Sequence, residues 1–76
     1  MEITNTELTL KKNIKKLREK AELSGYMVAK KIGINSTYYY RMEDLNVHQQ
    51  IGYHILEKLA ALYDVSVSDL FSTNVQ

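Results

Sequence analysis

In the middle of the chain, two short segments with helical spacing are separated by one glycine, and this constrains the fold more than any other feature. Val28, Ala29 and Ile32 lie on one face of a helix, and Gly33 follows directly. Glycine often ends a helix, because it adopts the left-handed conformation without a steric penalty. Asn35 can then accept hydrogen bonds from the unpaired amides of a new helix. The sequence therefore predicts two short helices joined by a tight turn.

Helical spacing also precedes this pair. Apolar residues that recur at helical intervals are Leu10, Ile14, Leu17 and Ala21. They predict a helix over about residues 7–21, after a flexible arm of residues 1–6. Ser24 is the predicted N-cap of the second helix, and the third helix is predicted to cover about residues 36–43.

The remainder of the chain predicts a loop, a fourth helix and a final short turn. Polar residues dominate 44–52 and predict the loop. The apolar stripe of the fourth helix comprises Tyr53, Ile55, Leu56, Leu59, Ala60, Leu62 and Tyr63. Ser66 and Asp69 have the spacing of a capping box, which predicts a last turn carrying Leu70 and Phe71 into the core.

A chain of 76 residues provides for one small domain with one core. We assign residues 7–71 to an all-α domain of five helices and residues 72–76 to a tail. The chain contains no Cys, so neither disulfides nor thiolate metal sites can stabilise it. No apolar run approaches the roughly 18 residues that a membrane helix requires. We therefore expect a cytoplasmic protein with no membrane segment.

No pattern of residues indicates catalysis. His48 and His54 are not accompanied by Cys or by an acidic cluster, whereas a metal site requires three or four ligands. The sequence shows no set of nucleophile and base, and no glycine-rich phosphate loop. We expect no enzyme activity, no metal and no other cofactor.

Charge is divided unequally along the chain. Residues 11–31 contain eight Lys and Arg and two Glu, a balance of +6, whereas residues 43–76 contain five acidic residues and one Lys, a balance of −4. This asymmetry is typical of a molecule that turns one face toward a polyanion. The alternative is a lysine-rich helix face that is simply solvated.

The third predicted helix has distinct inner and outer faces, because successive residues step about 100° around the axis. Tyr39 and Met42 are predicted to face the core. The outward positions are Ser36, Thr37, Tyr40 and Arg41. A DNA major groove about 12 Å wide admits one helix, and arginine can bind a guanine through two hydrogen bonds. The alternative for Arg41 is a surface ion pair with Glu43 or Asp44.

Two tyrosines of this helix have two interpretations each. The hydroxyl of Tyr38 or Tyr40 can donate a hydrogen bond to a DNA phosphate. Either ring can instead pack against the first helix or against the loop after the third helix.

Several of these residues stand in an order that is typical of one known family. Ala29 stands at the contact of two helices, Gly33 in the turn and Glu43 at the end of the third helix, and the domain closes with Val65-x-Val67-x-x-Leu70-Phe71. Over about residues 10–71 the chain resembles the Cro/C1-type (XRE family) helix-turn-helix DNA-binding domains. The resemblance implies a compact five-helix, lambda-repressor-like domain that binds double-stranded DNA at a pseudo-palindromic operator as a homodimer.

The resemblance also implies roles for individual residues. The base-reading positions are Ser36, Thr37, Tyr40 and Arg41. The phosphate positions are Ser24, Gly25, Tyr26, Asn35 and Tyr38. Many members of the family have Gln where this chain has Gly25, and Gly where it has Leu45.

Two functions remain open at this point. The first is a transcriptional repressor or activator, with no small-molecule effector expected in so short a chain. The second is a protein-interaction module of the same fold, such as an antitoxin-like or regulatory partner subunit, with little or no DNA binding. Exposed tyrosines suit both functions, because tyrosine is also enriched at protein interfaces.

Overall fold

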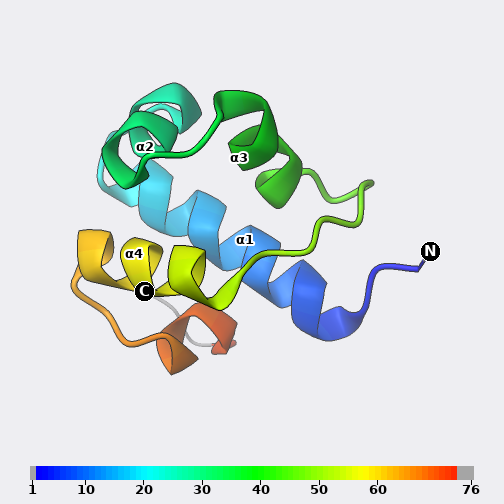
Figure 1. Ribbon diagram of the computed structural model, residues 1–76. Coiled ribbons are helices and arrows are strands. Elements are labelled where there is room, and N and C mark those ends of the chain that lie inside the picture. The colour runs from blue at the N-terminus through cyan, green and yellow to red at the C-terminus, as the bar shows by residue number, and fades with distance from the viewer. Residues whose placement is uncertain (1, 74–76) are drawn as a thin grey trace.

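The computed structural model describes residues 2–73, and this part of the chain contains four α-helices, one 3-10 helix and no strand. The elements are α1 (Asn5–Lys20), α2 (Gly25–Ile32), α3 (Ser36–Glu43), α4 (Tyr53–Tyr63) and the 3-10 helix η1 (Ser68–Phe71). In the view of Figure 1, α1 crosses the middle of the molecule, with α2 and α3 on one side and α4 and η1 on the other. The predicted all-α fold is confirmed, although the fifth helix is a 3-10 turn.

The first helix begins earlier than the predicted start at about residue 7. It begins at Asn5, where Thr4 is the N-cap and its Oγ1 accepts a hydrogen bond from the Glu7 amide at 3.1 Å. Thr4 followed three residues later by Glu7 is the local signal for this start. Residues 5 and 6 therefore belong to α1 and not to the arm. Residue 1 of the arm and residues 74–76 of the predicted tail lie outside the described residues.

One core is built from all five elements. Its buried apolar residues are Leu10, Ile14, Leu17, Val28, Ala29, Ile32, Tyr39, Met42, Ile55, Leu56, Leu59, Ala60 and Leu70. Tyr39 and Met42 have no exposed surface, which confirms the predicted inner face of α3. Ala21 is the exposed C-cap of α1 and does not extend its buried face.

The end of the described chain is fastened to α1. Asn13 is buried, and its Nδ2 donates to the carbonyl oxygens of Leu70 at 2.8 Å and Ser72 at 2.7 Å. The predicted capping box is also present, because the amides of Ser66 and Asp69 donate to each other's side chains. These bonds hold η1 against α1 and leave the opposite side of α1 to α2 and α3.

Candidate nucleic-acid interface

Side-chain caps set the boundaries of α2 and α3. Ser24 Oγ accepts from the Met27 amide at 3.1 Å, and Asn35 Oδ1 accepts from the Thr37 amide at 2.8 Å. Between the helices, Gly33 adopts the left-handed conformation with φ at 77°. The amide of Ile34 then donates to the Ala29 carbonyl at 2.9 Å and closes the turn. The two predicted N-caps and the predicted end of the second helix at Gly33 are confirmed.

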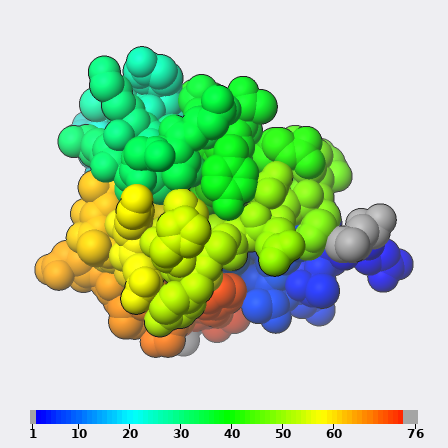
Figure 2. Space-filling view, viewed as in Figure 1, coloured from blue at the N-terminus to red at the C-terminus, as the bar shows by residue number. Residues whose placement is uncertain are grey.

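The outer face of α3 is accessible. Thr37, Tyr40 and Arg41 are exposed, and Ser36 is half-buried. Because Tyr39 and Met42 are held in the core, α3 cannot rotate about its axis without exposing them. The helix therefore presents one fixed side to solvent. Figure 2 shows α2 and α3 together forming the upper part of the face in view.

A partly buried network of side-chain hydrogen bonds fastens the end of α3 to α1. Glu43 accepts from Arg18 through two bonds, Nε at 2.7 Å and Nη2 at 3.0 Å, and it also accepts from the hydroxyl of Tyr39. Burial and the bond to Glu43 raise the pKa of Tyr39, and Glu43 raises the pKa of Arg18. Arg18 Nη1 also donates to the Leu23 carbonyl at 2.9 Å, so one guanidinium joins α1, α3 and the segment before α2.

Lys11 caps the C-terminal end of α3 from inside the molecule. Its side chain is fully buried, and Nζ donates to the carbonyl oxygens of Arg41 at 2.7 Å and Met42 at 3.3 Å. A positive charge here interacts favourably with the dipole of α3. Burial lowers the pKa of Lys11, while the charge of Glu7 opposes that shift. Lys11 is therefore structural and does not belong to a solvated lysine-rich face of α1.

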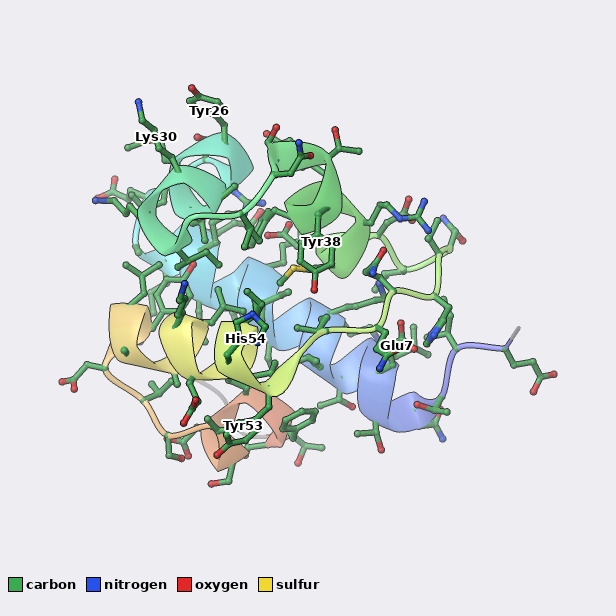
Figure 3. The ribbon with its side chains drawn as sticks, in the orientation of Figure 1. Glu7, Tyr26, Lys30, Tyr38, Tyr53 and His54 are labelled. Carbon is green, nitrogen blue, oxygen red and sulfur yellow. The ribbon has the colours of Figure 1, made fainter. Side chains whose placement is uncertain are left out.

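Glu7 holds the loop after α3 against the first turns of α1. Its carboxylate lies 2.6 Å from His48 Nδ1, accepts from the Gln49 amide at 2.9 Å and lies 3.7 Å from Lys11 Nζ. Burial opposes ionisation of Glu7, but these bonds and charges outweigh it, so its pKa lies below the ordinary value. Figure 3 shows Glu7 beneath the loop. His48 thus has a structural role.

Arg41 is exposed in the last turn of α3. Its Nε donates to Gln49 Oε1 at 2.9 Å, which occupies one of the five N–H donors of the guanidinium. No ion pair joins Arg41 to Glu43 or Asp44 within residues 2–73, and Glu43 is taken by Arg18. In the free protein Arg41 is thus bonded to Gln49 and to neither of these carboxylates.

The tyrosines of α3 differ in their surroundings. Tyr38 is half-buried, and its hydroxyl donates to the Gln50 carbonyl at 3.3 Å, so its ring packs toward the loop. Tyr40 is 51% exposed, and its ring makes an edge-to-face contact with Tyr39 at 6.3 Å between centroids. The packing alternative thus describes Tyr38 in the free protein.

The predicted phosphate positions on α2 also differ from one another. Tyr26 is 58% exposed and projects away from the body of the molecule beside Lys30 (Figure 3). Ser24 and Asn35 are exposed N-caps. Gly25 is buried, although it is the first residue of α2.

Sequence reasoning missed Lys11 and Arg18 as residues that support this surface. Their positions in a lysine-rich segment distinguish neither from its solvated neighbours.

Within the described residues, no group of three or more His, Asp or Glu side chains is placed to hold a metal ion. In the same range no helix has both the length and the apolar character of a membrane span.

Comparison with known proteins identifies the family of the chain. The family model for the helix-turn-helix domain matches residues 14–70, and it describes DNA-binding regulators, not enzymes. Searches of curated proteins and of solved structures returned no match. The matched range contains α2, the turn, α3, the loop and α4. It therefore includes the exposed outer face of α3 and the exposed residues of α2. The chain therefore belongs to the Cro/C1-type (XRE) helix-turn-helix family of DNA-binding regulators.

Proposed function

We propose that this protein is a sequence-specific transcriptional regulator that reads the DNA major groove with α3 as a homodimer. The observation that carries the proposal is the outer face of α3, where Thr37, Tyr40 and Arg41 are exposed on a helix fixed from behind by the core. A helix held in this way can enter the groove with its side chains directed at base edges.

The reading residues have complementary chemistry. Arg41 is suited to a guanine, and the methyl group of Thr37 to a thymine methyl. Ser36 and Tyr40 complete the proposed base-reading set. Ser24, Tyr26, Asn35 and Tyr38, with the amides at the start of α2, are the proposed phosphate contacts. For Tyr38, this contact requires that its bond to the Gln50 carbonyl be exchanged for one to DNA.

The homodimer places two copies of α3 in successive major grooves. Two half-sites are then expected about one helical turn apart, roughly 34 Å. Selection of bound sequences from random duplex DNA tests the proposal directly. A pseudo-palindromic motif is the expected result, and enrichment of no motif by the purified protein would contradict the proposal.

Substitution of Arg41 tests the assignment of a base contact. Arg41→Ala is expected to weaken binding to the selected sequence by about 1–3 kcal/mol and to relax preference at one base pair. Lys12→Ala, on the exposed side of α1, serves as the control and is expected to weaken binding to all sequences alike. Equal loss on every sequence for both variants would show that Arg41 contacts only the backbone.

Exposed aromatic and other apolar residues favour the second candidate, a protein-interaction module. Tyr26, Met27 and Tyr40 are 58%, 45% and 51% exposed. Salt dependence separates the two functions, because each neutralised phosphate contributes a slope of about −0.9 to the plot of log affinity against log salt. A steep slope supports DNA binding, and an affinity for DNA that is undetectable at low salt supports the second candidate.

A further inference from the structure

Gly25 occupies a place where the chain has space for no side chain. A methyl group built on its Cα would lie 2.6 Å from Tyr40 Cε1, 3.1 Å from Tyr40 Cζ and 3.2 Å from Tyr39 Cδ2. Carbon atoms in favourable contact are separated by about 3.5–4.0 Å. The two rings therefore lie directly against the backbone of the first turn of α2.

The backbone conformation does not explain the glycine. Within the described residues, Gly33 is the glycine with positive φ, and Gly25 has ordinary helical geometry. Glycine is also a poor helix former. What a side chain at position 25 would change is therefore the space beside the Tyr40 ring.

Tyr40 is consequently an exposed side chain with a constrained direction. One side of its ring faces the Gly25 backbone, and another contacts Tyr39 at an interplanar angle of 74°. Tyr39 is itself immobilised by complete burial and by its bond to Glu43. Half of the Tyr40 side chain still faces solvent at the junction of α2 and α3.

We propose that Gly25 is a positioning residue for DNA recognition: by lacking a side chain, it seats the Tyr40 ring across the junction of α2 and α3, so that Tyr40 meets DNA in one orientation. The inference rests on the proposed function. A side chain that is already ordered in the free protein loses little conformational entropy on binding. The absence of a side chain at Gly25 thus acts through Tyr40, separately from any contact between the Gly25 amide and a phosphate.

The test is a double-mutant cycle on binding to the selected duplex. Gly25→Ala is expected to displace the ring toward solvent and to weaken binding by about 5- to 20-fold, with altered preference at the base pairs beside Tyr40. Tyr40→Ser is expected to weaken binding as well. Gly25→Ala added to Tyr40→Ser is then expected to change affinity by less than about 2-fold, because the overlapping ring is absent.

Two further measurements separate positioning from a general effect on folding. Gly52→Ala, the same substitution at the N-cap of α4, is the matched control and is expected to leave DNA binding unchanged. In the free protein, nuclear Overhauser contacts between the Gly25 α-protons and the Tyr40 ring are expected. In Gly25→Ala, contacts from residue 25 to this ring are expected to weaken, while melting curves show that the fold persists.

Each outcome decides a specific point. Unchanged affinity and base preference in Gly25→Ala, or in Tyr40→Ser, would overturn this inference while leaving the proposed function in place. Equal losses from Gly25→Ala with and without Tyr40 would show that Gly25 acts independently of the ring. If the unaltered protein selects no DNA sequence, the proposed function and this inference fail together. If Gly25→Ala does not fold, the result for Tyr40→Ser and the Gly25–Tyr40 contacts in the free protein decide the inference.

Discussion

Lys11 has no solvent-exposed surface, yet its ammonium group makes three directed contacts. It donates to the carbonyl oxygens of Arg41 and Met42 and lies 3.7 Å from the carboxylate of Glu7. A buried charge is tolerated when such partners replace its water. The C-terminal end of α3, the proposed reading helix, is thus held by one side chain from α1.

Replacement of Lys11 with methionine tests this role. Lys11→Met keeps the length and apolar part of the side chain but removes the ammonium group that contacts the carbonyl oxygens of Arg41 and Met42 and the Glu7 carboxylate. We expect the free energy of unfolding to fall by about 1–3 kcal/mol, as measured by urea denaturation. Lys12→Met, at an exposed neighbour, is the matched control and is expected to change stability by less than about 0.5 kcal/mol. Similar values for the two variants would mean that the buried bonds contribute nothing net.

Among the elements, the α2–turn–α3 unit has the clearest local determinants. Ser24 and Asn35 cap the two helices through bonds within the first turn, and Gly33 ends α2 in the left-handed conformation. All three signals act between residues close in sequence. The predicted bounds of α3, residues 36–43, therefore agree with the structure.

Gly33 gives a prediction at this scale. No atom lies within 4 Å of a methyl group built at Gly33, so Gly33→Ala introduces backbone strain without an overlap. We expect it to reduce stability by about 1–2 kcal/mol, because an L-residue pays this cost in the left-handed conformation. Asp64, the C-cap of α4, has φ at 56°, so Asp64→Gly is expected to preserve or increase stability. Thermal melting of both variants measures the difference, and equal melting temperatures would refute it.

The whole molecule is organised around α1. Glu7 contacts the loop after α3, Asn13 contacts the end of η1, and Arg18 contacts the end of α3. These three residues join segments that lie 25 to 57 positions away in the chain. Such ties couple both sides of the molecule, so we expect it to unfold in one cooperative transition.

The Glu7 carboxylate makes stability depend on pH. Its pKa is lower in the folded chain than in the unfolded chain, because the Gln49 amide, His48 and Lys11 favour the charged form. The unfolded state therefore binds a proton first as the pH falls. The contribution of Glu7 is complete above its ordinary pKa, about 4.3, and is lost as the pH falls through the lower folded value.

Glu7→Gln should remove this part of the pH dependence. Below about pH 4, the unfolding free energy of the variant is expected to decrease less steeply than that of the unaltered chain. Glu57→Gln, at an exposed site on α4, provides the comparison. Denaturation curves collected from pH 7 to pH 3 measure both slopes, and identical slopes for the two variants would exclude a special role for Glu7.

The structure agrees with the sequence predictions for α3 where burial or local capping decides the outcome. Tyr39 and Met42 face the core because the helical period places them on the apolar side. The helical period placed Tyr40 outward and Tyr38 at the margin, but it left open whether either ring packs against the protein or meets a phosphate. Only the position of the loop after α3 distinguishes them, because its Gln50 carbonyl accepts a hydrogen bond from the Tyr38 hydroxyl.

By itself, the amino-acid sequence determined the approximate positions of the helices, the caps at Ser24 and Asn35, the turn at Gly33 and the outer face of α3, because these depend on residues within about one helical turn. The tertiary structure alone decided that Lys11 and Arg18 are internal and that Gly25 lies beneath the Tyr40 ring. These outcomes depend on which distant elements pack together. The local sequence of a charged or polar segment does not indicate which distant residue will contact it.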